Sequence, residues 1–160
     1  MPAPRFRRLL PALAFAIGCT ASAAVLAQAP GQTLTINIGN VRTAKGVVHV
    51  DICPQDSFLK DDCPWSGQAP ARLGTTQVIV RDLPPGHYAA QAFHDENGNT
   101  KVDRALFGIP KEGVGFSRDA RISFGPPSWA NAVFGYNGSN STINFNLRYF
   151  LGPKGPPGAQ

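Results

Sequence analysis

The sequence predicts an all-β protein, a single antiparallel β-sandwich of about seven strands with one long loop rich in glycine and proline. Three observations support this fold class. Apolar and polar residues alternate with period two in several runs, Gly, Pro and Asn separate these runs, and no segment of similar length has helical periodicity. Strands of this kind are apolar on one face only, so about seven of them need two packed sheets.

Five runs carry the clearest alternation. In chain order, their apolar faces consist of Leu34, Ile36 and Ile38; Val48, Val50 and Ile52; Val78 and Val80; Tyr88, Ala90 and Ala92; and Ile143, Phe145, Leu147 and Tyr149. The last run is the most regular because Asn144, Asn146 and Arg148 occupy its opposite face, so its apolar members should be buried. Shorter runs at 100–107, 120–124 and 132–136 raise the number of predicted strands to seven or eight. Helical structure is limited to short turns near 57–61 and 128–130.

The N-terminal residues have the pattern of an export signal. Arg5, Arg7 and Arg8 precede a short apolar run over 9–17, and an A-x-A-like cleavage site follows at Ala27. The apolar run is too short for a membrane span of roughly 20 residues. We therefore expect a signal peptide at 1–27, a β-sandwich domain at 28–150 and a disordered tail at 151–160, in a periplasmic or secreted protein. An alternative is a lipoprotein anchored through Cys19, because the residues before it resemble a lipobox.

The charge of the mature protein is close to neutral. The chain has 15 Lys and Arg against 10 Asp and Glu, and residues 1–27 contain three of the arginines and no acid. The remaining chain therefore has 12 Lys and Arg against 10 Asp and Glu, a net charge of +2. It has no run of Lys and Arg that could follow a phosphate backbone, so the sequence does not predict a nucleic-acid partner.

The two cysteines of the mature chain predict a disulfide. Cys53 and Cys63 enclose a polar loop, and an oxidising compartment favours a bridge between such a pair. A zinc site is poorly supported, because neither cysteine belongs to a CxxC pair and no histidine lies at ligand spacing.

A cluster of oxygen-bearing side chains follows the fourth alternating run. Asp95, Asn97, Asn99 and Asp103 occupy the first, third, fifth and ninth positions of a calcium-type loop, and Lys101 could supply its carbonyl at the seventh. An EF-hand would need Gly at the sixth position and Glu at the twelfth, and both are missing. Two interpretations stay open: a Ca²⁺ loop completed by Glu96 or Glu112, and a plain hairpin with Asn97-Gly98 in a type I′ turn.

Catalytic motifs are weakly represented. The histidines His49, His87 and His94 have no metal-ligand spacing, and Ser117 lacks the second glycine of a nucleophile elbow. The remaining enzymatic hypothesis is an unrecognised site around His94, Asp95 and Asp103.

Aromatic and aliphatic residues also occur in segments rich in glycine and proline. They are Phe107, Ile109, Phe116, Phe124 and Trp129. Such residues either pack as a long loop over the sandwich or form a recognition surface.

Several motifs resemble a bacterial family catalogued as domain of unknown function 2141. The motifs are Leu83-Pro84-Pro85-Gly86-His87-Tyr88, the segment 93–99 with Asp103, and the segments 107–113, 115–117, 124–128 and 132–134. The Leu-Pro-x-Gly-x-Tyr segment is also similar to the strand entry of transthyretin-like and adhesin B-type modules. The resemblance covers about Leu34 to Tyr149 and implies an exported immunoglobulin-like or transthyretin-like sandwich, with no known activity.

Together these features predict an exported, non-catalytic module that has a binding or structural role in the cell envelope. Its location points to an envelope protein or a carbohydrate as the partner. Ca²⁺ is the one cofactor that the sequence suggests.

Overall fold

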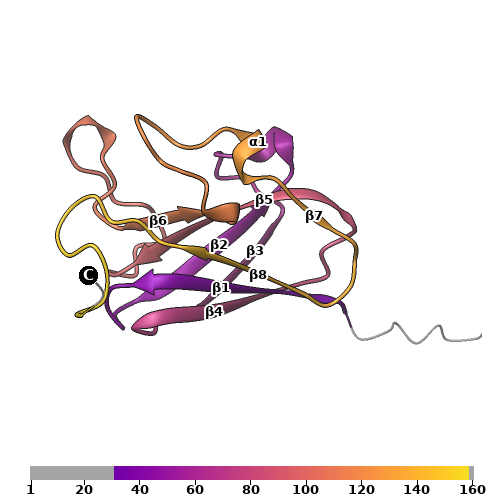
Figure 1. Ribbon diagram of the computed structural model, residues 1–160, viewed down its shortest axis with the longest axis horizontal. Coiled ribbons are helices and arrows are strands. Elements are labelled where there is room, and N and C mark those ends of the chain that lie inside the picture. Colours follow the sequence, from indigo (N-terminus) through magenta and orange to yellow (C-terminus); the bar gives the residue numbers. More distant parts are fainter. Residues whose placement is uncertain (1–30, 159–160) are drawn as a thin grey trace, which may run out of the picture.

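The computed structural model describes residues 31–158. It consists of two sheets with eight strands and one short helix, α1 (Trp129–Ala132), in a sandwich-like arrangement (Figure 1). The predicted signal peptide and Cys19 lie outside the described residues. Within residues 31–158, no helix is long and apolar enough to cross a membrane.

The first sheet has three strands in the order β4 (Gly74–Arg81), β1 (Thr33–Val41) and β8 (Ser141–Asn146). β1 is antiparallel to β4 but parallel to β8, with Ile36 opposite Ile143. The sequence prediction of a wholly antiparallel sandwich is therefore wrong at this pair. Period-two alternation identifies a strand and its buried face, but it contains no information on the direction of the neighbouring strand.

The second sheet is antiparallel throughout, in the order β3 (Trp65–Pro70), β2 (Val47–Cys53), β5 (Gly86–Asp95) and β6 (Gly113–Phe116). A further strand, β7 (Phe134–Tyr136), pairs with the beginning of β5. β3 and β6 were not predicted, because their short, Gly-containing sequences lack regular alternation. The predicted strands at 100–107 and 120–124 are loops instead.

The main core lies between the two sheets and contains most of the predicted apolar faces. Leu34, Val50 and Leu147 have no exposed surface, and Phe145 is 2% exposed. Ile143 packs against this core but is only half-buried, because β8 is the edge strand of its sheet. Replacing a buried phenylalanine such as Phe145 by alanine costs about 3–5 kcal/mol in proteins of this type.

The two sheets are joined along one side. Beyond the end of β8, Arg148 no longer pairs with β1. Instead, Arg148 pairs with Val114 of β6 through two backbone hydrogen bonds of 3.1 and 2.8 Å. β6 is therefore held between β5 and the segment that follows β8. The loops at both ends of β6 consequently start from a fixed position.

A second apolar cluster covers the outer face of β5. It is formed by Cys53, Phe58, Ala89, Phe116, Ala120 and Ala132, with Cys63, Ile122 and Trp129 packed against it. The Phe58 ring meets the rings of Phe116 and Trp129 edge to face, with centroids 6.0 and 5.7 Å apart. The loop that contains Phe58 and helix α1 therefore lie side by side at this face (Figure 1).

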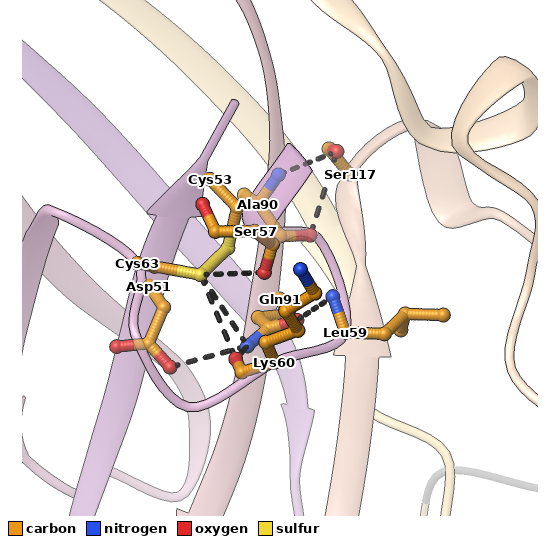
Figure 2. Close-up of a disulfide and its surroundings, with 9 residues drawn as sticks. All are labelled: Asp51, Cys53, Ser57, Leu59, Lys60, Cys63, Ala90, Gln91 and Ser117. Atoms are coloured by element: carbon orange, nitrogen blue, oxygen red, sulfur yellow. Dashed lines mark hydrogen bonds between the residues drawn. A yellow bond between two sulfur atoms is a disulfide. The ribbon is translucent and has the colours of Figure 1, made fainter. Parts of the chain in front are cut away.

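The predicted disulfide is present at the base of this cluster. Cys53 at the end of β2 is bonded to Cys63, with their Cα atoms 4.8 Å apart. Gln91 on β5 holds the enclosed loop, because its side-chain oxygen accepts the Leu59 N–H at 3.1 Å and its amide donates to the Lys60 carbonyl at 3.1 Å (Figure 2). A disulfide indicates an oxidising, extracytoplasmic location.

The predicted disordered tail is described as far as residue 158, and its first part lies against the end of β1. The Asn40 amide donates to the carbonyls of Leu147 and Lys154, at 2.7 and 2.8 Å. Arg42 donates to the Leu151 carbonyl at 2.9 Å. The Gly- and Pro-rich composition of this segment does not indicate these contacts, because its backbone carbonyls make them.

Candidate functional site

Asp95 is the last residue of β5 and organises the acidic loop, residues 95–103. Its side chain has no exposed surface. One carboxylate oxygen accepts the N–H groups of Gly98 and Asn99 at 2.7 and 3.1 Å, and the other accepts the Thr100 N–H at 2.7 Å. Burial alone would raise the pKa of Asp95, but these backbone donors outweigh it and hold the pKa below its ordinary value.

The other predicted calcium ligands of the acidic loop contact one another. Asn97 and Asn99 donate their side-chain N–H groups to the two carboxylate oxygens of Asp103, at 2.7 and 2.9 Å. Their amide oxygens accept the backbone N–H groups of Asn99 and Lys101, at 3.0 and 2.9 Å. Turning either amide to offer its oxygen beside Asp103 would break one of these backbone bonds.

This arrangement bears directly on metal binding. A Ca²⁺ ion needs about 6–8 oxygen ligands facing a common centre. Here N–H groups face the oxygens of Asp95 and Asp103. Among residues 31–158, no group of three or more His, Cys, Asp or Glu side chains is placed to hold a metal ion. The arrangement fits a loop closed by its own hydrogen bonds better than a calcium cage, and calcium binding stays a prediction to be tested.

The alternative of a type I′ hairpin turn at Asn97-Gly98 is wrong in its turn type. A type I′ turn needs positive φ at both central residues. Gly98 has φ +77°, but Asn97 is not among the described residues with positive φ. Thr100, in contrast, has φ +63°. The Asp95 side chain, rather than a two-residue turn, reverses the chain here.

Glu112 ties the two ends of the acidic loop together. It is 4% exposed, and its carboxylate oxygens accept the N–H groups of Glu96 and Asp103, both at 3.1 Å. Burial raises the pKa of Glu112, and the two backbone donors offset only part of this effect. The sequence suggested Glu112 as a calcium ligand, whereas the structure places it beneath the loop as an anchor.

The acidic loop continues into a narrow projection, residues 103–111, which we call the finger. Lys111 donates its N–H to the Asp103 carbonyl at 2.8 Å, and Ala105 donates to the Ile109 carbonyl at 2.7 Å. The Arg104 side chain adds a bond to the Gly108 carbonyl at 3.2 Å. The finger is therefore a closed structure with its own backbone ladder, although the sequence predicted a strand over most of it.

Large apolar side chains are exposed at the tip of the finger. Leu106 is 76% exposed, Phe107 is 91% exposed and Ile109 is 39% exposed. Phe107 has φ +61°, a backbone conformation that bulky residues rarely adopt. Its ring gains almost no burial in return. Leu106 is not among the residues of the predicted recognition surface.

The five residues of the predicted recognition surface do not lie together. Phe124, in the loop over residues 120–127, is fully exposed, and Phe107 is largely exposed. Phe116 is buried and Trp129 is half-buried, and both belong to the second apolar cluster. Of these five residues, Phe107, Ile109 and Phe124 therefore contribute exposed apolar surface.

The histidine of the enzymatic hypothesis is buried. His94 has no exposed surface. One ring nitrogen lies 2.8 Å from the Lys45 carbonyl, and the other lies 2.8 Å from the Tyr149 hydroxyl. The carbonyl can only accept, so the first nitrogen carries a proton. Burial raises the pKa of Tyr149 to about 12, so this hydroxyl stays protonated at neutral pH.

An open cleft of about 960 Å³ lies between the acidic loop and the C-terminal tail. Arg42 and Glu96 form a two-pronged ion pair on its wall, and the Arg42 guanidinium lies 4.4 Å from the centre of the Tyr149 ring. The hydrogen bond between them raises the pKa of Arg42 and lowers that of Glu96. Arg42 and Glu96 therefore pair their charges with each other. Because Arg42 also donates to the Leu151 carbonyl, the pair links the acidic loop to the tail.

Comparison with known proteins gives one match. The model of a family described as "Uncharacterized protein conserved in bacteria (DUF2141)" matches residues 36–144. No curated protein and no solved structure matches the chain.

Proposed function

The chain belongs to the DUF2141 family of uncharacterised bacterial proteins, and we propose that it is an exported, non-catalytic binding module of the cell envelope. In this proposal the finger is the binding element. The observation that carries it is Phe107, which is held 91% exposed with a positive φ at the tip of a hydrogen-bonded loop. A bulky apolar residue in a strained, solvent-exposed position lowers stability, so its presence favours a role outside the fold.

The positions of the candidate catalytic residues support this proposal. Asp95 accepts backbone N–H groups and His94 contacts a carbonyl and a buried hydroxyl. A general base must reach the proton that it removes, whereas both side chains face inward. Asp103 accepts the amides of the acidic loop. Asp95 and Asp103 therefore hold the shape of the loop beneath the finger, and His94 links Lys45 to Tyr149.

We also propose that the sandwich is of the immunoglobulin-like or transthyretin-like type. The Tyr88 hydroxyl donates to the Pro84 carbonyl at 3.0 Å, four residues upstream. This bond resembles the tyrosine corner of immunoglobulin-like sandwiches. The parallel pair formed by β1 and β8 is a difference from a wholly antiparallel arrangement.

Export is part of the same proposal. The disulfide supports an extracytoplasmic location, and the basic and apolar N-terminal residues support a signal peptide that ends at Ala27. Whether the chain is cleaved after Ala27 or lipidated at Cys19 is decided by the mass and N-terminal residue of the exported chain. A mature chain that starts at Gln28 would support cleavage.

Fractionation of bacteria that export the chain tests the proposed function. The wild-type protein should remain with the envelope fraction, and a variant with both Phe107→Ser and Phe124→Ser should move to the soluble fraction. Leu73→Ser is the matched control, because Leu73 is 55% exposed between β3 and β4. Equal distribution of the wild type and the double variant would contradict the proposal.

A further inference from the structure

Two loops with exposed apolar tips leave opposite ends of β6. The finger ends at Lys111, shortly before β6 begins at Gly113, and the second loop, residues 120–127, follows the turn after Phe116. Both loops project from the same side of the molecule, at the upper left of Figure 1. Leu106 and Phe107 lie at the tip of one, and Phe124 lies in the other. Each tip is a convex projection.

The segment that carries both tips is rich in exposed positive charge. The segment 101–124 contains five exposed cations, Lys101, Arg104, Lys111, Arg118 and Arg121. Among the described residues, the ion pairs involve Arg42, His49 and His94, and none of these five.

The three acidic side chains of this segment accept hydrogen bonds from N–H groups of the protein. Asp103 accepts the amides of Asn97 and Asn99, and Glu112 accepts two backbone N–H groups. Asp119 accepts the backbone and side-chain N–H groups of Asn146. With five cations against three carboxylates, of which Glu112 is buried, the segment keeps a net charge of +2.

We propose that the two loops form a surface that binds an anionic lipid bilayer. Leu106, Phe107 and Phe124 enter the boundary between headgroups and acyl chains, while the lysines and arginines contact the anionic headgroups. This inference rests on the proposed function and names its partner. A lipid surface fits better than a protein partner, because separate convex tips lack the continuous, well-packed core of a protein interface, whereas a fluid bilayer closes around each tip.

Flotation with lipid vesicles tests the inference. The probe is the chain without residues 1–27, mixed with vesicles of phosphatidylglycerol and phosphatidylethanolamine or with vesicles of phosphatidylcholine alone. We expect binding to the anionic vesicles that weakens as salt is added. Phe107→Ser should lower the partition coefficient by about tenfold or more, the effect of withdrawing a phenyl ring from an apolar environment.

Two further variants separate charge from apolar contact. Lys101→Ala should weaken binding to the anionic vesicles about fivefold, as expected for one cation near an anionic surface. Leu73→Ser should bind like the wild type, and circular dichroism confirms that every variant is folded.

The outcomes distinguish this inference from the proposed function. If the double variant leaves the envelope fraction but the wild type does not float with anionic vesicles, the partner is a protein or carbohydrate and the lipid inference is wrong. Equal flotation of the wild type and Phe107→Ser also overturns it. If envelope retention itself is independent of Phe107 and Phe124, the proposed function fails.

Discussion

Asp95 shows how a single side chain can set the course of a loop. β5 ends at this residue, and its carboxylate accepts the N–H groups of Gly98, Asn99 and Thr100. The Asn99 N–H also donates to the Asn97 amide oxygen, whereas the N–H groups of Gly98 and Thr100 use the carboxylate as their acceptor. The residue that the sequence suggested as a metal ligand therefore acts as the acceptor for the loop backbone.

Replacing this carboxylate should therefore remove a pH-dependent contribution to stability. Asp95→Asn should lower the free energy of unfolding by about 1–3 kcal/mol at neutral pH, because a backbone donor then faces an amide. The pKa of Asp95 is lowered in the folded protein. Its contribution is therefore present above the unfolded pKa of about 3.9 and is lost as the pH falls through the lower folded value.

Urea unfolding of the two proteins across this pH range measures the difference. The gap between the wild type and Asp95→Asn should shrink as the pH falls below about 4. Asp62→Asn, at an exposed carboxylate in the disulfide loop, should change stability by less than about 0.5 kcal/mol. A gap that stays constant from neutral to acid pH would show that the Asp95 charge is unimportant.

At the scale of elements, the acidic loop and the finger form one unit. Glu112 holds both ends of the acidic loop, and Lys111 pairs with Asp103 at the base of the finger. The hydrogen bonds of the acidic loop therefore fix the base from which Leu106 and Phe107 project. This explains why oxygen-rich side chains at calcium-type spacing lie next to an apolar tip.

A calcium titration tests the packing of the acidic loop. We expect added Ca²⁺ to leave the melting temperature unchanged, because N–H groups already face the oxygens of Asp95 and Asp103. A true site at 100 times its Kd would stabilise the protein by about 2.7 kcal/mol, a shift of several degrees. A shift of this size that disappears in Asp103→Asn would instead establish the calcium interpretation.

The disulfide stabilises a second unit, the loop that carries Phe58. Changing both Cys53 and Cys63 to serine should lower the free energy of unfolding by about 2–3 kcal/mol, the chain-entropy estimate for a loop of this length. Thiol titration of the denatured, unreduced chain without residues 1–27 checks the bridge itself. Two reactive thiols per chain would contradict it.

The sequence predicted the elements whose pattern is local. β1, β2 and β8 alternate regularly, and one face of each is buried or nearly so. β3 could not be predicted because Trp65–Pro70 includes a glycine and ends at a proline, and its pairing depends on β2. For the candidate site, spacing indicates a cluster of oxygen-bearing side chains from Asp95 to Asp103, but the role of Glu112 depends on contacts with Glu96 and Asp103 that spacing does not reveal.

At the scale of the whole molecule, the sandwich acts as a support for the loops of β6. The main core fixes the two sheets, and the pairing of Val114 with Arg148 joins them beside β6. Phe107 and Phe124 lie outside both apolar clusters and are exposed. Their loss should therefore affect binding much more than stability, in contrast to loss of a core residue such as Phe145.

The most direct test asks whether position 107 leaves water when the protein meets the envelope. An environment-sensitive dye is attached through Phe107→Cys and, as the control, through Leu73→Cys, with the native disulfide left oxidised. On addition of isolated envelopes, the dye at position 107 should shift to shorter emission wavelength and the dye at position 73 should not. An unchanged spectrum at position 107, or equal shifts at both positions, would contradict the proposal that the finger is the binding element.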